Sequence, residues 1–255
     1  MQKVVLVLGG TRNTGIAVVR KFASQGFAVA LTSRRQAEAD RAAAETAADY
    51  PVPVRGYETD MRSVASVRAL FARVREDFGR VDVMVTVAAD LGMGFSVMDA
   101  TEEAFDNVMD TNIKGCFFCC QEAAHLMQEQ GGGSIVLIGS VHGGGAVWGR
   151  SLYATSKGAV HSMVRNLALE LAEYHIRVNE VVPGAVRTDR WDGISPEEEA
   201  RRRRNWPTGR EADPSEIAEG VWYLSSDAAK SITGTDLVID SGVSACLLAY
   251  NGGQH

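Results

Sequence analysis

Short apolar runs alternate with helix-like stretches along the whole chain, and this alternation strongly limits the folds available to it. The runs are continuously apolar, as strands are when both faces of a sheet are covered. The pattern therefore predicts an α/β fold with a doubly wound, seven-stranded parallel sheet and helices on both faces. The strands are expected at Val4–Leu8, Ala28–Thr32, Val52–Tyr57, Val81–Val87, Ser134–Ile138, Arg177–Val182 and Asp236–Ile239, and the helices at about 15–25, 35–49, 62–78, 101–129, 152–173 and 213–226.

Length and apolar segments favour a single domain over residues 1–255. A chain of 255 residues fits one α/β domain, which commonly reaches about 250 residues. No apolar run approaches the roughly 18 residues that a membrane span requires, and the first residues lack the pattern of a signal peptide. Four cysteines, three of them crowded between 116 and 120, do not indicate a disulfide framework. We therefore expect a cytoplasmic protein with no membrane partner.

Basic residues are concentrated at the N-terminus of an otherwise acidic chain. No Asp or Glu precedes Glu38, so residues 1–37 carry a charge of +6, whereas the whole chain carries −6. A local basic segment indicates an anion-binding site, because nucleic-acid binding requires a broader basic face. The acidic remainder would repel a polyphosphate backbone, so we expect no DNA or RNA partner.

A glycine-rich turn follows the first predicted strand and leads into the first predicted helix. Such a turn brings backbone N–H groups close to a pyrophosphate, and the start of the helix favours negative charge. A glycine-rich turn alone is a weak signal, but its position directly after the first strand strengthens it. The candidate cofactor contacts in this turn are Gly9, Thr11, Arg12, Gly15 and Ile16.

The end of the second predicted strand indicates which dinucleotide is bound. NAD-binding folds usually have an acid there that binds the ribose 2′-hydroxyl, whereas an arginine accommodates a 2′-phosphate. This chain has Ser33 and Arg34 at the end of the strand, and no acid. A guanidinium binds a phosphate through paired hydrogen bonds, while a carboxylate would repel it. The sequence therefore predicts NADP(H) as the cofactor.

Tyr153 and Lys157 are four residues apart in a predicted helix, so both side chains project from one helix face. A nearby ammonium stabilises a phenolate and makes a tyrosine a usable acid or base near neutral pH. Ser140 lies thirteen residues before Tyr153, just after a predicted strand. The three residues are therefore candidates for a proton-transfer site at the carboxyl edge of the sheet.

Taken in order, these motifs resemble the short-chain dehydrogenase/reductase (SDR) family over nearly the whole chain. Each motif is weak alone, whereas their common order and spacing is specific. The resemblance implies a Rossmann-like fold and a homotetramer in which the 101–129 and 152–173 helices pack against their mates. The matching elements are the glycine-rich turn, Asp60 after the third strand, Asn112, Ser140, Tyr153-x-x-x-Lys157 and Pro183-Gly184-x-x-x-Thr188.

The resemblance also implies the catalytic roles. Tyr153 would give a proton to the carbonyl oxygen during reduction and remove it during oxidation, while Ser140 would donate a hydrogen bond to that oxygen. Lys157 would bind the hydroxyls of the nicotinamide ribose, and Asn112 would position a water that links Lys157 to solvent. A positioned acid of this kind contributes about 10²–10⁴ in rate.

Further cofactor contacts follow from the same resemblance. Thr188 and the Val186 backbone would hold the nicotinamide carboxamide, which fixes the face that delivers the hydride. Asp60, with Met61 beside it, would contact the adenine, and Ala88 would lie against the cofactor after the fourth strand.

The glycine-rich turn and the segment after the fourth strand depart from the family pattern. Leu8 replaces the usual Thr, five residues separate Gly9 from Gly15, and Ala17 replaces the last Gly. The longer spacing is similar to the divergent enoyl-reductase branch, which however spaces its Tyr and Lys seven apart. The family's N-N-A-G segment reads Thr86-Val87-Ala88-Ala89 here. Loss of polarity there and at Leu8 together leaves no buried partner unsatisfied.

Three other patterns are interpreted as structural. Cys116-x-x-Cys119 has redox spacing, but it lies in an apolar helical stretch where cysteine packs as a small hydrophobe. The five histidines form no ligand spacing with a cysteine or an acid, so no metal site is expected. Ser140 and His142 lack the G-x-S-x-G frame of a hydrolase nucleophile.

Residues 189–207 are expected to form a lid over the substrate. A helix beginning near Ser195 would place acids in its first turn and the run Arg201–Arg204 in its last, which suits the helix dipole. The alternative is that these arginines attract an anionic substrate, such as a carboxylate or an acyl carrier. The candidate substrate contacts are His142, Trp148, Arg190 and Trp191.

The sequence predicts an NADPH-dependent carbonyl reductase, reversible as an alcohol dehydrogenase, acting on a small-molecule ketone or secondary alcohol. A 3-oxoacyl-[acyl-carrier] reductase is the alternative enzyme, favoured if the arginine run binds the carrier. A non-catalytic NADP(H)-sensing regulator is the alternative from another class, although it would have little reason to retain Ser140, Tyr153 and Lys157 together. The sequence leaves the substrate, its stereochemistry and the physiological direction open.

Overall fold

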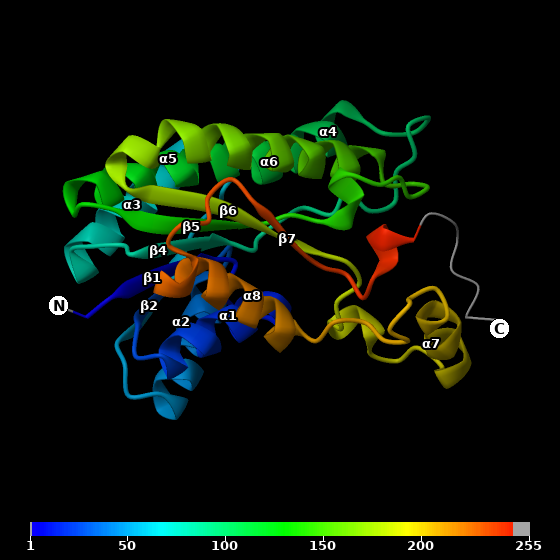
Figure 1. Ribbon diagram of the computed structural model, residues 1–255, viewed down its shortest axis with the longest axis horizontal. Helices are drawn as coiled ribbons and strands as arrows, with labels where there is room; N and C mark the ends of the chain where they lie inside the picture. The colour runs from blue at the N-terminus through cyan, green and yellow to red at the C-terminus, as the bar shows by residue number, and fades with distance from the viewer. Residues whose placement is uncertain (1, 247–255) are drawn as a thin grey trace.

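The computed structural model describes residues 2–246, which contain a parallel sheet in the order β3-β2-β1-β4-β5-β6-β7 (Figure 1). The chain starts in the middle of the sheet, winds outward to β3, and then returns to β4 beside β1. This reversal leaves a crevice at the carboxyl ends of β1 and β4, where doubly wound sheets bind ligands. The predicted seven-stranded sheet is confirmed. Its strands are β1 (Val4–Leu8), β2 (Ala28–Ser33), β3 (Val54–Glu58), β4 (Val83–Thr86), β5 (Gly133–Ile138), β6 (Ile176–Pro183) and β7 (Asp236–Ile239).

Helices cover both faces of the sheet, as the alternating pattern predicted (Figure 1). One face carries α1 (Asn13–Ser24), α2 (Gln36–Asp49) and α8 (Pro214–Ser225). The other carries α3 (Val64–Phe78), α4 (Glu102–Met109), α5 (Cys116–Glu129) and α6 (Ser151–Glu170). The short helix α7 (Pro196–Arg203) lies beyond the carboxyl edge of the sheet. Within residues 2–246, no helix has the length and apolarity needed to cross a membrane.

The continuous apolar character of β1 is explained by two separate cores. Leu6 and Leu8 belong to a buried cluster with side chains of α3, α5 and α6. Val5 and Val7 point the other way and pack with α1, α2 and α8. Each fully buried Leu or Val side chain contributes about 1.5–3 kcal/mol through removal from water. The strand therefore needs apolar residues at every position, and all five are buried.

The predicted 101–129 helix is helical from Glu102 to Glu129, but one of its turns is wider than expected. It consists of α4, a π-helical turn at Asp110–Gly115, and α5. Gly115 ends the wider turn and has no room for a side chain, because a Cβ there would lie 2.3 Å from the Met61 carbonyl oxygen. Asn112 lies within the turn and is buried, with 3% of its surface exposed. Such turns often mark functional sites, and this one carries a predicted catalytic residue.

Candidate active site

A cavity of about 750 Å³ lies at the carboxyl ends of β1 to β4, where the topology leaves its crevice. Eight of the predicted cofactor contacts line it: Gly9, Thr11, Arg12, Ser33, Arg34, Asp60, Met61 and Ala88. Five others do not line this cavity: Gly15, Ile16, Lys157, Val186 and Thr188. The cavity walls are rich in polar and cationic side chains, which suits a phosphorylated ligand.

The glycine-rich turn requires glycine for steric reasons that differ between positions. Gly9 has a left-handed backbone with φ +84°, and a Cβ there would lie 2.8 Å from Ala88. A Cβ on Gly15 would lie 1.9 Å from the Gly9 carbonyl oxygen. Gly15 therefore allows α1 to approach the turn and does not itself form the cavity wall. Leu8 is fully buried and Ala88 packs against the same apolar cluster, as expected when both polar partners are replaced together.

The two arginines that follow β2, Arg34 and Arg35, differ in their partners. Arg35 forms an ion pair with Glu38, and Ser33 Oγ donates a hydrogen bond to the same carboxylate at 2.7 Å. Hydrogen bonds from Arg35 and then from Ser33 lower the Glu38 pKa. Arg34 has no hydrogen bond or ion pair with any residue in the 2–246 region. The sequence analysis did not identify Glu38, although it is the first acid of the chain and comes five residues after Ser33.

Asp60 has a partner of its own at this cavity. Its carboxylate accepts hydrogen bonds from the Arg62 guanidinium at 2.8 and 3.1 Å. These hydrogen bonds are the main reason that the Asp60 pKa is lowered. Asp60 therefore keeps its negative charge at neutral pH while it borders the cavity.

The predicted catalytic residues meet beside the end of β5. Ser140 Oγ lies 2.9 Å from His142 Nδ1, and the His142 and Tyr153 rings meet edge to face with centroids 5.6 Å apart. Lys157 Nζ lies 5.6 Å from the centroid of the Tyr153 ring and donates to the Ile138 carbonyl at 2.6 Å. Lys157 is buried, with only 5% exposed. The structure therefore places Ser140 and Tyr153 in contact with His142, and Lys157 against the Tyr153 ring.

His142 also restrains the Ser140 hydroxyl. Burial, followed by the nearby Arg150 charge, lowers the His142 pKa below its usual range, so its ring is neutral at pH 7. The His142 backbone N–H donates to Ser140 Oγ at 3.3 Å. The Ser140 hydroxyl accepts this bond and keeps its own hydrogen to donate. The neutral His142 ring can accept that hydrogen at Nδ1. His142 therefore restrains the Ser140 side chain through two contacts.

Asn112 ties the loop after β4 to α6. Its Oδ1 accepts from the Asp90 backbone N–H at 2.7 Å, and its Nδ2 donates to the Asp90 carbonyl at 2.8 Å. The second amide hydrogen goes to Ser156 Oγ at 2.9 Å. Both amide hydrogens are therefore used by the protein. The Asn112 side-chain amide therefore has no hydrogen left to donate to a water. A relay water at Asn112 would have to donate a hydrogen bond to an oxygen of this residue.

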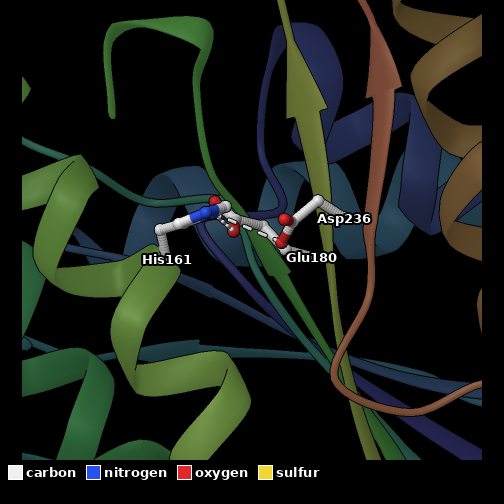
Figure 2. Close-up of side chains that lie close together, drawn as sticks. All are labelled: His161, Glu180 and Asp236. Atoms are coloured by element: carbon white, nitrogen blue, oxygen red, sulfur yellow. Dashed lines mark hydrogen bonds and ion pairs between the residues drawn. The ribbon is translucent and has the colours of Figure 1, made fainter. Parts of the chain in front are cut away.

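A second group of titratable side chains lies apart from this site, on α6, β6 and β7 (Figure 2). His161 Nδ1 is 3.1 Å from Glu180 Oε2 and 3.3 Å from Asp236 Oδ1. His161 comes one helical turn after Lys157 on the same helix. The sequence analysis missed this group, because its members are separated by 19 and 56 residues and only the sheet topology brings them together.

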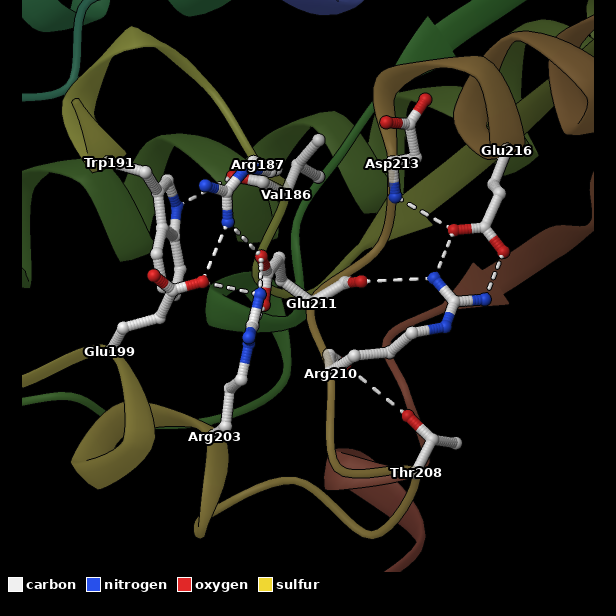
Figure 3. A network of polar contacts seen from close by, with 10 residues as sticks. All are labelled: Val186, Arg187, Trp191, Glu199, Arg203, Thr208, Arg210, Glu211, Asp213 and Glu216. Atoms are coloured by element: carbon white, nitrogen blue, oxygen red, sulfur yellow. Dashed lines mark hydrogen bonds and ion pairs between the residues drawn. The ribbon is translucent and has the colours of Figure 1, made fainter. Parts of the chain in front are cut away.

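The lid segment 189–207 contains the predicted helix, and its arginines are mostly paired. Ser195 Oγ accepts from the Glu198 backbone N–H at 3.2 Å, so α7 begins as the sequence indicated. Arg201 and Arg202 bind Glu198 at 2.7 and 2.8 Å. Arg203 binds the buried Glu211 at 2.8 Å, as Figure 3 shows. Three of the four arginines in the run Arg201–Arg204 therefore form ion pairs with carboxylates of this chain.

Glu211 is the centre of this lid network (Figure 3). Only 4% of it is exposed, and it accepts hydrogen bonds from Arg203 at 2.9 Å and from Arg187 at 2.8 Å. The Arg203 hydrogen bonds are the largest cause that lowers the Glu211 pKa to about 2. A second link joins the lid to the glycine-rich turn, because Asn13 Oδ1 accepts from the Asp189 backbone N–H at 3.1 Å.

The predicted substrate contacts have different surroundings. Trp191 is 8% exposed, and its Nε1 donates to the Val186 carbonyl at 3.1 Å, so it packs inside the lid. Arg190 Nε donates to Thr188 Oγ1 at 3.3 Å. Trp148, in contrast, is 93% exposed on the loop after β5. Of the four residues, His142 has direct contacts with Ser140 and Tyr153.

Comparison with known proteins identifies the family. Residues 9–244 match a family model described as Enoyl-(Acyl carrier protein) reductase. A 3alpha-hydroxysteroid dehydrogenase from Mediterraneibacter gnavus is 36% identical, with 93% of this chain and 95% of the relative covered. A human 3-oxoacyl-[acyl-carrier-protein] reductase is 34% identical, with 97% of this chain and 100% of the relative covered.

Solved structures agree with these relatives. A short-chain dehydrogenase/reductase from Serratia marcescens superposes with a TM-score of 0.88 and 31% identity, covering 95% of this chain and 98% of that one. The chain therefore belongs to the short-chain dehydrogenase/reductase family and is an oxidoreductase that acts on hydroxyl and keto groups.

Proposed function

We propose that this chain is an NADPH-dependent carbonyl reductase, reversible as an alcohol dehydrogenase, in which Tyr153 is the general acid and base. The observation that carries this proposal is the meeting of Ser140, His142, Tyr153 and Lys157 at one edge of the sheet. A sensor of nucleotides would need the cavity but not this proton-transfer group.

The residues divide the chemistry between them. During reduction, Ser140 donates a hydrogen bond to the carbonyl oxygen of the substrate and Tyr153 gives that oxygen a proton. Lys157, a buried ammonium beside the Tyr153 ring, stabilises the phenolate that remains. His142 releases the Ser140 hydroxyl when the substrate oxygen arrives, and accepts it again when the product leaves. A bound nicotinamide supplies the hydride.

The cavity residues fit a phosphorylated dinucleotide. Gly9 borders the cavity, and both its left-handed backbone and the close approach of Ala88 require a glycine there. Arg12, Arg34 and Arg35 all border the cavity, and Arg34 has no partner among the described residues that would have to be displaced. An unpaired guanidinium at the end of β2 suits a 2′-phosphate better than a 2′-hydroxyl. We therefore assign NADP(H), with Ser33 and Arg34 at the phosphate.

Exposed apolar side chains on two loops favour a large apolar substrate. Half of the ten exposed large hydrophobic residues described lie on the loops after β4 and β5, which flank Ser140 and Tyr153. Single exposed hydrophobic residues are ordinary, but a concentration beside a site marks a ligand-binding surface. These five residues are Met93, Val97, Met98, Val147 and Trp148.

The 3-oxoacyl-[acyl-carrier] reductase alternative receives less support. It depended on an arginine run that is free to bind an acidic carrier. Arg201, Arg202 and Arg203 are instead paired with Glu198, Glu199 and Glu211. A substrate with an apolar body near its carbonyl fits the loops better than a charged carrier fits α7.

Exposed apolar residues also support the homotetramer proposed from the family resemblance. Phe105, Phe117 and Leu169 are exposed on α4, α5 and α6. Burial of these helices against the same helices of a second copy would cover them. Light scattering of the purified protein measures the mass directly, and a monomer at micromolar concentration would contradict this assembly.

A panel of carbonyl substrates tests the proposed function. NADPH consumption is measured with ketones of increasing apolar size, with small polar ketones and with 3-oxoacyl thioesters. We expect the kcat/KM for large apolar ketones to exceed the other values. NADPH binding without turnover of any substrate would support the sensor instead. Preference for the thioesters would support the acyl-carrier reductase.

A further inference from the structure

His161, Glu180 and Asp236 converge from α6, β6 and β7 on the side of the sheet that carries the catalytic helix (Figure 2). One nitrogen or oxygen ligand atom from each residue lies within 4.8 Å of the other two. His161 is half-exposed, whereas Glu180 is 1% exposed. The group therefore has one side that opens to solvent and one side that is closed.

The spacing of the three atoms matches the edges of a metal coordination tetrahedron. Zinc binds histidine nitrogen and carboxylate oxygen at about 2.0–2.2 Å, so the ligand atoms of a tetrahedral site are about 3.3–3.5 Å apart. His161 Nδ1 lies 3.1 Å from Glu180 Oε2 and 3.3 Å from Asp236 Oδ1. Two edges of the tetrahedron are therefore already near their final length.

The polar atoms of this group do not all have hydrogen-bond partners. Asp236 Oδ1 is buried and accepts no hydrogen bond, although it lies 3.3 Å from His161 Nδ1. Glu180 fits only because residue 139 is a glycine, since a Cβ there would lie 1.5 Å from Glu180 Oε1. Two adjacent carboxyls in a closed site favour a cation between them.

Arg165 orients this group from outside. Its Nη2 donates to Asp236 Oδ2 at 2.6 Å, and its Nη1 donates to the His161 carbonyl at 2.9 Å. One oxygen of Asp236 is thus occupied, and the other faces His161 and Glu180. Outer hydrogen bonds that hold a ligating carboxylate in this way are typical of metal sites.

We propose that His161 Nδ1, Glu180 Oε2 and Asp236 Oδ1 form a binding site for a divalent transition-metal ion such as Zn²⁺. A water from the open side beside His161 would complete four-coordination. This proposal departs from the sequence expectation of no metal, which considered only ligand spacing along the chain. These ligands are supplied by three elements that are adjacent in the fold.

The position gives the ion a structural role. It would join α6, which carries Tyr153 and Lys157, to β6 and β7. The Glu180 side chain packs against Gly139, the residue before Ser140. An ion there would hold the catalytic helix in register with the sheet without contacting the substrate.

Metal titration of the chelator-treated, full-length protein tests the site. Co²⁺ serves as the probe, because its visible absorption bands report a tetrahedral nitrogen and oxygen environment, and Zn²⁺ is then added as a competitor. We expect one Co²⁺ per chain, displaced by Zn²⁺, and a rise in Tm when either metal is present. Absence of binding, or bands typical of six oxygen ligands, would overturn the proposal.

Matched variants locate the ion. His161→Ala and Asp236→Asn should each weaken Co²⁺ binding by about tenfold or more, whereas His125→Ala, at an exposed histidine on α5, should leave it unchanged. Two independent variants keep the test valid if one of them does not fold. Equal Co²⁺ affinity in all three variants would show that the metal binds elsewhere. That result would leave only a network of ion pairs among His161, Arg165 and the two carboxylates, and it would not affect the proposed reductase activity.

Discussion

Two arginine-rich segments of this protein look alike in sequence and differ in the structure. Arg34 and Arg35 follow β2, and Arg201–Arg204 end α7. Both were candidates for binding an anion. At β2, Arg34 keeps its guanidinium unpaired among the described residues and borders the cavity. In α7, Arg201 to Arg203 are paired with carboxylates of their own helix or of Glu211.

The comparison shows that a run of arginines in the sequence does not determine whether those arginines are free to bind a ligand. Glu198 and Glu199 lie three or four residues before the arginines that they bind, so helical spacing alone predicts those pairs. Glu211, in contrast, approaches Arg203 only because the chain turns back after the lid (Figure 3). At β2 the first acid is Glu38, which reaches Arg35 and Ser33 but leaves Arg34 to the cavity.

Arg34→Asp should have the largest effect of the changes that test this comparison. The substitution removes charge-assisted hydrogen bonds to a 2′-phosphate and introduces repulsion, so NADPH affinity should fall by about 10- to 100-fold or more. NADH affinity should change far less. Cofactor fluorescence titrations measure both constants, and equal losses for the two cofactors would reject the 2′-phosphate assignment.

Glu211→Gln should destabilise the lid. A neutral amide leaves Arg187 and Arg203 without their shared buried carboxylate, which costs about 1–3 kcal/mol in the free energy of unfolding. Urea denaturation followed by tryptophan fluorescence measures the change. Glu198→Gln, whose carboxylate is far more exposed, is the matched control and should have a smaller effect. A reversed order would mean that Glu211 does not organise the lid.

The same network predicts a dependence of stability on pH. The Glu211 pKa is about 2 in the folded chain, below the value of about 4.3 expected when unfolded. The carboxylate therefore contributes its full stability above pH ~4.3, and the contribution is lost as pH falls toward 2. The stability difference between the wild type and Glu211→Gln should shrink over this range in urea denaturation. A constant difference from pH 6 to pH 2.5 would contradict the assignment.

Glu38→Gln should have a moderate effect of the opposite sign. Removal of this carboxylate frees Arg35 and Ser33 and reduces negative charge beside the phosphate site, so NADPH affinity should rise by less than about fivefold. NADH affinity should stay the same. A fall in NADPH affinity would show that Glu38 positions Ser33 for the phosphate and does not compete with it.

Arg201→Ala should have the smallest effect. Within residues 2–246, this exposed side chain pairs only with Glu198 on the helix surface, and surface pairs of this kind contribute little. The Tm and the KM values for neutral and anionic ketones should all remain near those of the wild type. A selective rise in KM for anionic ketones would indicate that α7 does bind the substrate.

Sequence reasoning located elements whose signal is local. The bounds of Val4–Leu8 and Asp236–Ile239 were predicted as observed. All five residues of Val4–Leu8 are buried, so an apolar run between polar turns marks that strand. The pairing of Tyr153 with Lys157 follows from helical spacing, and their meeting with Ser140 follows from parallel strands that end at one edge. The start of α7 at Ser195 follows from a capping residue and an acidic first turn.

Features that depend on contacts between distant segments were missed. At the end of the π-helical turn, Gly115 closely approaches Met61, which is far from it in the sequence. The cluster around Glu180 depends on the order of β6 and β7, which residue spacing does not contain. The burial of Trp191 inside the lid depends on Val186 and on the neighbouring Trp206. In each case the prediction would have required the distance between two residues that are far apart in the sequence.

The central claim is that Tyr153, with Ser140 and Lys157, transfers a proton to and from the substrate oxygen. Tyr153→Phe tests it most directly, because the change removes a single hydroxyl and retains the ring that faces His142 and Lys157. NADPH affinity should stay within about twofold of the wild type, while kcat for ketone reduction should fall by at least about 10²–10⁴. Wild-type turnover in this variant would contradict the account.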